Sequence, residues 1–168
     1  KPLVKIDKRS ILEIKINQYC KQGFKDFIFC IGYKGDLIRK EVSILDFAIN
    51  AFYSDAGEEA GILKRLYHAK DLFGIQVLLT YGDTVTNLDL NKLESFHNKS
   101  ENEVTIVVAP IRNPFGLVEY NNQNKVTYFK EKPILNYYIG YAMINRASLE
   151  LIPSSVLNLP DGEGLVVF

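Results

Sequence analysis

Cysteine and histidine are scarce in this sequence. Two Cys and two His residues occur among 168, with no Cys-x-x-Cys pair, so a zinc site is not expected. Cys20 and Cys30 are typical of reduced thiols in a cytoplasmic protein. No apolar run approaches the roughly 20 residues that a membrane-spanning helix needs, so a membrane protein of that kind is excluded.

An excess of either charge is also missing. The chain holds 20 Lys and Arg residues against 20 Asp and Glu residues, so its formal net charge is zero. Domains that hold nucleic acid by their overall field are usually strongly basic, and nucleic acid is therefore not an expected partner. Any phosphate must be bound by a few local residues.

Three common catalytic motifs are absent as well. The sequence contains no Gly-x-Gly-x-x-Gly, no Walker lysine loop and no Gly-x-Ser-x-Gly elbow. His68 lies in a predicted helix and His97 at the end of another, and neither follows a strand. Surface or packing roles are therefore expected for both histidines.

The residues that are present predict one globular domain. Hydrophobic residues make up 47% of the chain, which excludes a disordered segment. A chain of 168 residues is long enough to bury about 70% of its unfolded surface, so we expect a single domain over residues 1–168. The chain starts at Lys1 without a visible signal peptide and stops inside an apolar run at 164–168, and we expect truncation at both ends.

Apolar runs alternate with segments of helical periodicity through the first two thirds of the chain. Ser10 and Glu13 have the spacing of a capping box, which predicts a helix that ends at Gly23. The predicted strands are 27–31, 49–53, 77–81 and 104–109, and the further helices are 35–45, 61–72 and 89–98. This order predicts a three-layer α/β/α domain with a mainly parallel, Rossmann-like sheet.

The pattern changes from Gly116 onward. Strand patterns at 117–120 and 126–129 flank Asn121-Asn122-Gln123-Asn124, which is a hairpin signal. A further strand at 137–144 and a short helix at 146–151 follow. We therefore expect an antiparallel addition to the parallel sheet near the C-terminal third.

Polar residues that follow predicted strands are the first candidates for a site. Ligands of open α/β sheets bind outside the carboxyl ends of the strands. Gly82 and Asp83 follow the strand at 77–81, and a carboxylate there can hold Mg²⁺ together with substrate phosphates. An ordinary Gly-Asp turn is the alternative.

Two further segments are candidates with their own alternatives. Pro133 predicts an extended Lys132, whose ammonium would leave the sheet edge in a fixed direction and bind a phosphate. A solvated lysine at a strand end is the alternative. The loop at 57–61 precedes a predicted helix, whose N-terminus attracts anions, but Glu58 and Glu59 oppose an anion there. Taken alone, that loop predicts only a turn.

Several short motifs, in this order, resemble those of sugar-1-phosphate nucleotidylyltransferases. They are Lys-Pro-Leu-Val-Lys-Ile at 1–6, Gly-Phe-Lys-Asp at 23–26, Gly-Tyr-Lys-Gly at 32–35, Ala-Gly-Ile-Leu at 60–63, Leu-Thr-Tyr-Gly-Asp at 79–83, Pro-Phe-Gly-Leu-Val at 114–118, Phe-Lys-Glu-Lys-Pro at 129–133 and Tyr-Ile-Gly-Tyr at 138–141. Together with Lys64-Arg65, the motif at 79–83 is most similar to the glucose-1-phosphate cytidylyltransferase branch.

The resemblance implies a reaction, a cofactor and a set of residues. A sugar 1-phosphate would attack the α-phosphorus of a nucleoside triphosphate, giving a nucleotide sugar and pyrophosphate, with Mg²⁺ as cofactor. The implied catalytic residues are Lys1, Asp83, which would hold the metal, and Lys132. The implied nucleotide-binding residues are Lys1, Gly61 and Gly82. The implied sugar-phosphate residues are Gly116, Glu131, Lys132 and Gly140, the two glycines leaving room for the sugar ring.

The sequence also departs from this family. The family's Gly-rich, Arg-containing loop lies upstream of Lys-Pro-Leu, and its second metal aspartate has no match before Phe168. Glu58-Glu59 stands where many members have Gly-Thr. Two alternatives therefore stay open, a catalytically silent relative that acts as a regulatory or assembly module and an unrelated doubly wound ligand-binding domain. The nucleotide, the sugar, the pathway and the oligomeric state, including a homo-oligomer, stay open too.

Overall fold

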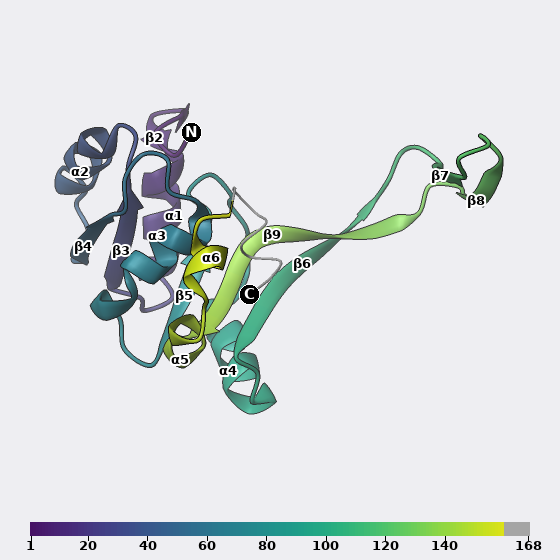
Figure 1. Cartoon of the computed structure of the whole chain (residues 1–168). Coiled ribbons are helices and arrows are strands. Elements are labelled where there is room, and N and C mark those ends of the chain that lie inside the picture. Colours follow the sequence, from purple (N-terminus) through teal and green to yellow (C-terminus); the bar gives the residue numbers. More distant parts are fainter. Residues whose placement is uncertain (160–168) are drawn as a thin grey trace.

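The chain forms a body of helices and small sheets from which a long two-stranded arm projects (Figure 1). The structure, a computed structural model, describes residues 1–159, so the apolar run at 164–168 lies outside the described residues. The helical elements are α1 (Ile11–Cys20), α2 (Gly35–Ser43), α3 (Ile62–His68), the 3-10 turn η1 (Lys70–Leu72), α4 (Leu90–Ser100), α5 (Arg146–Glu150) and α6 (Ser154–Leu157). The strands are β1 (Lys5–Ile6), β2 (Arg9–Ser10), β3 (Asp26–Ile31), β4 (Asn50–Asp55), β5 (Gln76–Thr80), β6 (Val104–Arg112), β7 (Leu117–Tyr120), β8 (Val126–Lys130) and β9 (Ile134–Asn145). No helix within residues 1–159 is both long and apolar enough to cross a membrane.

Local signals at the helix ends act as the sequence predicts. The Ser10 hydroxyl accepts a hydrogen bond from the Glu13 backbone N–H at 3.0 Å, which confirms the predicted start of α1. The Asp89 carboxylate caps α4 in the same way, at 3.0 Å. The helix predicted at 61–72 is shorter than expected, because α3 ends at His68 and the chain continues as η1.

The first sheet is parallel, as the alternation of strands and helices predicts. β3 pairs with β4 in parallel register along the whole of both strands. Leu12, Ile16 and Val42, from α1 and α2, form a buried cluster against apolar residues of this sheet. Burying each such side chain fully contributes about 1.5–3 kcal/mol, so this contact is a main source of stability for the N-terminal half.

The second sheet shows how the antiparallel addition is arranged. β9 lies between β5 and β6 and is antiparallel to both. β5 and β6 therefore run in the same direction, as the crossover through α4 requires, without being direct neighbours. The inner half of β9 is buried, including Tyr141, Ala142 and Ile144. The α/β class is confirmed, and the strand expected as an addition forms the centre of its sheet.

A cavity of about 900 Å³ lies between the two sheets and is lined by both β3 and β5. Within residues 1–159, β3 pairs with β4, and β5 pairs with β9. β3 and β5 do not pair with each other. The alternation of strands and helices in the sequence predicted one mainly parallel sheet. The structure instead has a parallel sheet, β3–β4, beside an antiparallel sheet, β5–β9–β6. Lys15, Arg65 and Gly82 are among the residues that line this cavity.

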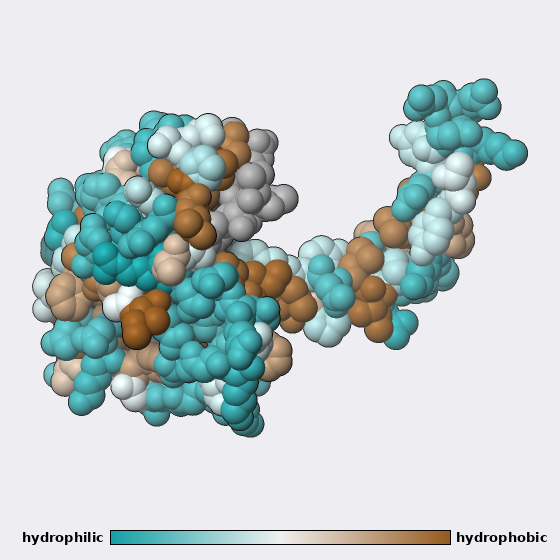
Figure 2. All heavy atoms as spheres, turned by 60° about the horizontal axis from the view of Figure 1, so that its bottom comes forward, coloured by the Kyte–Doolittle hydropathy of each residue, from teal (hydrophilic) through white to brown (hydrophobic). Residues whose placement is uncertain are grey.

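The arm, which we define as residues 108–138, consists of the outer halves of β6 and β9 and the hairpin β7–β8 (Figure 1). The hairpin prediction is confirmed, with Asn121 Oδ1 accepting two backbone N–H groups of the turn at 3.0 Å each. Large apolar side chains remain exposed along the arm (Figure 2), including Phe115 at 75% and Phe129 at 60%. The arm therefore has little core of its own.

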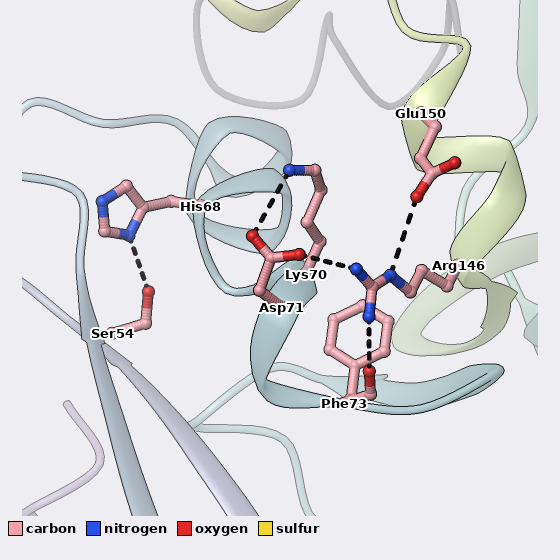
Figure 3. Close-up of polar contacts among 7 residues, drawn as sticks. All are labelled: Ser54, His68, Lys70, Asp71, Phe73, Arg146 and Glu150. Carbon is pink, nitrogen blue, oxygen red and sulfur yellow. Dashed lines mark hydrogen bonds and ion pairs between the residues drawn. The ribbon is translucent and has the colours of Figure 1, made fainter.

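Ion pairs join α5 to the segment that precedes β5 (Figure 3). The Arg146 guanidinium lies 2.6 Å from Asp71 and 3.7 Å from Glu150, and it donates a hydrogen bond to the Phe73 carbonyl at 3.2 Å. This network lies at the end of β5 opposite to Gly82 and Asp83, and we assign it a structural role.

Both histidines have structural partners. His68 contacts the Ser54 hydroxyl of β4 at 2.9 Å (Figure 3). His97 is 2% exposed and contacts the Thr105 hydroxyl at 2.8 Å and the Asn145 side chain at 3.0 Å. The predicted surface or packing roles are confirmed, because each ring binds a neighbouring strand and neither follows the carboxyl end of a strand.

Candidate active site

Lys1 and Asp83 meet at the carboxyl end of β5. The chain leaves β5 at Thr80 and turns through the β5 loop, which we define as residues 81–84. Lys1 Nζ lies 3.5 Å from Asp83 Oδ2. Pro2 packs so closely against Gly82 that a Cβ at Gly82 would lie 2.9 Å from the proline ring. Three residues selected from the sequence thus lie side by side at the sheet edge where ligands of α/β proteins bind.

Gly140 joins this group through Tyr81. Its φ is +77°, and its carbonyl accepts the Tyr81 N–H at 2.9 Å. A Cβ at Gly140 would lie 2.5 Å from the Tyr81 ring. The Tyr81 ring therefore occupies the position that a Cβ at residue 140 would take, and its close approach requires glycine there.

A buried lysine that the sequence analysis missed lies beneath the β5 loop. Lys15 of α1 is 2% exposed, and its ammonium donates to the Tyr81 carbonyl at 2.7 Å, the Tyr141 hydroxyl at 3.1 Å and the Thr84 carbonyl. These acceptors use all three of its protons. The Tyr141 hydroxyl also donates to the Thr84 carbonyl at 3.0 Å and accepts from the Tyr19 hydroxyl at 3.1 Å.

The same face of α1 and the turn that follows the helix bind the rest of the segment after β5. Gln18 donates to the Thr86 carbonyl, and the Gln22 side-chain oxygen accepts the Leu90 N–H at 2.8 Å. Lys15 and Gln18 are three residues apart and share one face of α1, and Gln22 follows in the turn just beyond the end of the helix at Cys20. That polar stripe on a largely buried helix is the signal in the sequence that could have identified Lys15.

Burial lowers the pKa of Lys15 from 10.5 to about 8, although the charge of Asp83 acts in the opposite direction. Between these two values the unfolded chain binds more protons at this site than the folded chain, so stability rises with pH. We expect the contribution of Lys15 to the free energy of unfolding to increase by about 2 kcal/mol between about pH 7.5 and about pH 10.

Urea denaturation of the unmodified chain and of the Lys15→Met variant at both pH values measures this change. Subtracting the free energy of unfolding of the variant from that of the unmodified chain cancels the titrations that both proteins share. One of these is the titration of Tyr141, whose pKa burial raises. A difference that does not change with pH would contradict the prediction.

Gly61 directly precedes α3 and closes a loop that Arg65 binds through backbone carbonyls. The Arg65 guanidinium donates to Ile31 at 2.5 Å and to Glu58 and Ala60 at 2.8 Å each. The side chain of Glu58 is exposed, so the loop is held by its backbone and not by its carboxylates. This arrangement fixes the loop at 57–61 against the carboxyl end of β3.

The sugar-phosphate residues predicted on the arm form a second group. A Cβ at Gly116 would lie 2.9 Å from the Phe129 ring and 3.4 Å from the Glu131 carboxylate. Lys132 Nζ lies 3.6 Å from the same carboxylate, and both side chains are exposed. The arm extends away from the body (Figure 1), so the structure does not bring Lys132 to Asp83.

The predicted backbone of Lys132 is wrong. Its φ is +44°, in the left-handed region, although Pro133 follows it and favours an extended residue. The cause is the short connection from β8, which ends at Lys130, to β9, which begins at Ile134. The chain does not reverse there, because β8 and β9 both run antiparallel to the outgoing strands β7 and β6. It bends within the three residues between them, and the bend overrides the local preference.

The donor set at Asp83 fits one mode of Mg²⁺ binding. No group of three or more His, Cys, Asp or Glu residues that could hold a metal occurs within residues 1–159. Mg²⁺, however, often binds through one or two carboxylates together with substrate phosphates and water. The single carboxylate of Asp83, whose side chain is 36% exposed, is compatible with an ion that arrives with a triphosphate.

Comparison with known proteins decides the family. The family model described as nucleotidyl transferase matches residues 1–144, which include β1 to β6, the arm and most of β9. The chain belongs to the nucleotidyl transferase family. This membership rules out the alternative of an unrelated doubly wound ligand-binding domain.

Curated relatives of this nucleotidyl transferase carry names of sugar-phosphate enzymes. A glucose-1-phosphate cytidylyltransferase of Salmonella typhimurium is 30% identical over 189 residues, covering 97% of this chain and 70% of that protein. A mannose-1-phosphate guanyltransferase of Aspergillus oryzae is 24% identical, covering 93% of this chain and 47% of that protein. The resemblance to sugar-1-phosphate nucleotidylyltransferases is thereby confirmed, as is membership of a family of enzymes.

A solved structure supports the fold of the nucleotidyl transferase. The crystal structure of HddC from Yersinia pseudotuberculosis matches with a TM-score of 0.73 and 18% identity, covering 90% of this chain and 70% of that one. A second structure of HddC, described as complexed with GMP-PN, matches with a TM-score of 0.72. At this identity the likeness concerns the fold alone.

Proposed function

We infer that this nucleotidyl transferase transfers a nucleotidyl group from a nucleoside triphosphate to a sugar 1-phosphate. The observation that supports this most directly is the pairing of Lys1 and Asp83, 3.5 Å apart, at the carboxyl end of β5. A carboxylate and an ammonium side by side are suited to a triphosphate, the first through a metal ion and the second directly. Such a transfer needs positioning and charge neutralisation more than covalent catalysis.

The reaction joins the sugar phosphate to the α-phosphorus. A phosphate oxygen of the sugar 1-phosphate forms the new P–O bond, while the bond to the β-phosphate oxygen breaks and pyrophosphate leaves. Mg²⁺ bound at Asp83 would neutralise phosphate charge. Lys1 contacts the triphosphate, and Gly61 and Gly82 let the backbone approach the nucleotide.

The residues of the arm are proposed to bind the other substrate. Lys132 binds the phosphate of the sugar 1-phosphate, and Glu131 accepts hydrogen bonds from sugar hydroxyls. Gly116 and Gly140 remain proposed neighbours of the sugar. Because the arm extends away from the body, it must bend toward Asp83 before Lys132 can contact a phosphate held there.

Relatives guide the choice of substrates. CTP with glucose 1-phosphate is the first pair to test, because the Salmonella relative is named a glucose-1-phosphate cytidylyltransferase. GTP with mannose 1-phosphate is the second, since the Aspergillus relative is named a mannose-1-phosphate guanyltransferase and HddC was solved with GMP-PN. We propose that the protein works in the cytoplasm, where such substrates occur.

The full-length protein is expected to release pyrophosphate from one triphosphate only when Mg²⁺ and a sugar 1-phosphate are both present. The test is a pyrophosphate-release assay with CTP, GTP, UTP and dTTP, each against glucose 1-phosphate and mannose 1-phosphate. Reactions without Mg²⁺ or without sugar phosphate are the controls. If folded full-length protein turns over none of these pairs, the enzyme proposal fails and the alternative of a silent regulatory or assembly module replaces it.

A further inference from the structure

The β5 loop is bound to the body on both sides of Asp83. On one side, Lys15 Nζ binds the Tyr81 carbonyl at 2.7 Å. On the other side, the same ammonium and the Tyr141 hydroxyl both bind the Thr84 carbonyl. One buried side chain therefore holds the two ends of the turn that carries Asp83.

Within residues 1–159, the one ion pair of the Asp83 side chain is a weak one. Its ion-pair partner Lys1 is 84% exposed, and exposed ion pairs contribute about 0–1 kcal/mol. The position of the carboxylate therefore depends on the backbone of the loop. That backbone is held from below by Lys15, which lies 66 and 69 residues away from its two carbonyl partners in the sequence.

The ammonium of Lys15 is well suited to this role. It is buried, its three protons have three acceptors, and it lies 4.8 Å from the centre of the Tyr141 ring and 5.5 Å from that of Tyr19. Without the ammonium, the carbonyls of Tyr81 and Thr84 would lose a charged donor, and the Thr84 carbonyl would keep the weaker, neutral bond from the Tyr141 hydroxyl. The loop would then sample other orientations of Asp83.

We propose that Lys15 is a positioning residue, whose buried ammonium fixes the β5 loop and thereby sets the position of the Asp83 carboxylate. The proposal deepens the proposed function, because a fixed carboxylate is what a metal-bound triphosphate requires. Lys15 itself does not contact the substrate. It acts through the backbone on either side of Asp83.

The test compares Lys15→Met with Lys21→Met in the 168-residue chain by hydrogen exchange and mass spectrometry. Lys21 is an exposed lysine that follows the same helix, so it controls for the loss of a positive charge. We expect Lys15→Met to speed amide exchange about 10-fold or more in a peptide over residues 81–86, with little change over β3 and β4. Lys21→Met should change neither region.

A second variant and a kinetic readout complete the test. Tyr141→Phe keeps Lys15 but removes the hydroxyl that binds Thr84. It should therefore speed exchange over 81–86 by a smaller factor than Lys15→Met does. It also replaces Lys15→Met if that variant does not fold. In the full-length enzyme, Lys15→Met should raise the Mg²⁺ concentration for half-maximal rate by about 10-fold or more, with the KM for the sugar 1-phosphate unchanged.

Two results would overturn the proposal. Exchange over 81–86 that stays at the unmodified rate would show that the loop does not depend on Lys15. Exchange that rises equally throughout the chain would show a general structural role. Absence of turnover in the unmodified enzyme is a different result, because it removes the proposed function while the exchange experiment still decides whether Lys15 fixes the loop.

Discussion

Replacing Asp83 by asparagine is expected to lower the Mg²⁺-dependent turnover of the full-length enzyme by about 100-fold or more. An amide has nearly the shape of a carboxylate but no charge, so the variant keeps the loop while losing the negative charge for a metal ion. The only ion pair affected within residues 1–159 is with Lys1, whose side chain is 84% exposed. The charge of Asp83 also favours the ammonium of Lys15, so we expect the free energy of unfolding to fall by about 1 kcal/mol or less.

The matched control for Asp83→Asn is Asp46→Asn. Asp46 is an exposed aspartate in the connection between α2 and β4, so the control changes the same charge away from β5. Turnover is measured by pyrophosphate release across a range of Mg²⁺ concentrations, and stability by urea denaturation. Full activity of Asp83→Asn would show that Gly82 and Asp83 form only a turn.

Replacing Gly140 by alanine is expected to lower the free energy of unfolding by about 2–4 kcal/mol. Two causes add at this position. The φ of +77° is unfavourable for any residue with a side chain, and the new Cβ would lie 2.5 Å from the Tyr81 ring. The ring has little room to move, because it packs edge-on against Tyr138 at 5.7 Å and its backbone is bound by Lys15 and Gly140.

Two other glycines separate these causes. Gly23 has a φ of +95° but no atom within 4 Å of an added Cβ, so Gly23→Ala should cost about 1 kcal/mol from strain alone. Gly74 has neither feature, and Gly74→Ala should change stability by less than about 0.5 kcal/mol. Urea denaturation of the three variants should reproduce this order. Equal losses at Gly140 and Gly23 would show that the contact with Tyr81 has no cost.

Most elements of the fold could be predicted because they depend on neighbours in the sequence. The Ser10 cap, the Asn121 hairpin turn and the apolar runs of β3 and β5 are local patterns, and each forms where it was expected. The arrangement of β9 between β5 and β6 could not be predicted in the same way. Strand order depends on which distant segments bury their apolar faces together, and a local pattern does not contain that information.

The residues of the candidate site also fall into those that local sequence predicts and those that only the tertiary structure places. Local sequence placed Gly82 and Asp83 after a strand, and the family motif placed Lys1 with them. The prediction for Lys132 was wrong because the bend between β8 and β9 outweighed the local effect of Pro133. The distance from Lys132 to the rest of the site depends on the path of the arm, which no short motif describes.

The sequence contains little cysteine and histidine and no excess of either charge. These absences alone restrict any phosphate chemistry to a few placed residues. By itself the sequence determined the α/β class, the local elements and the position of Asp83 at the end of a strand, because each follows from neighbouring residues. Only the tertiary structure decided what holds Asp83. The partners of Lys15 lie 66, 69 and 126 residues away, so its buried ammonium gains its role only when α1, β9 and the β5 loop pack together.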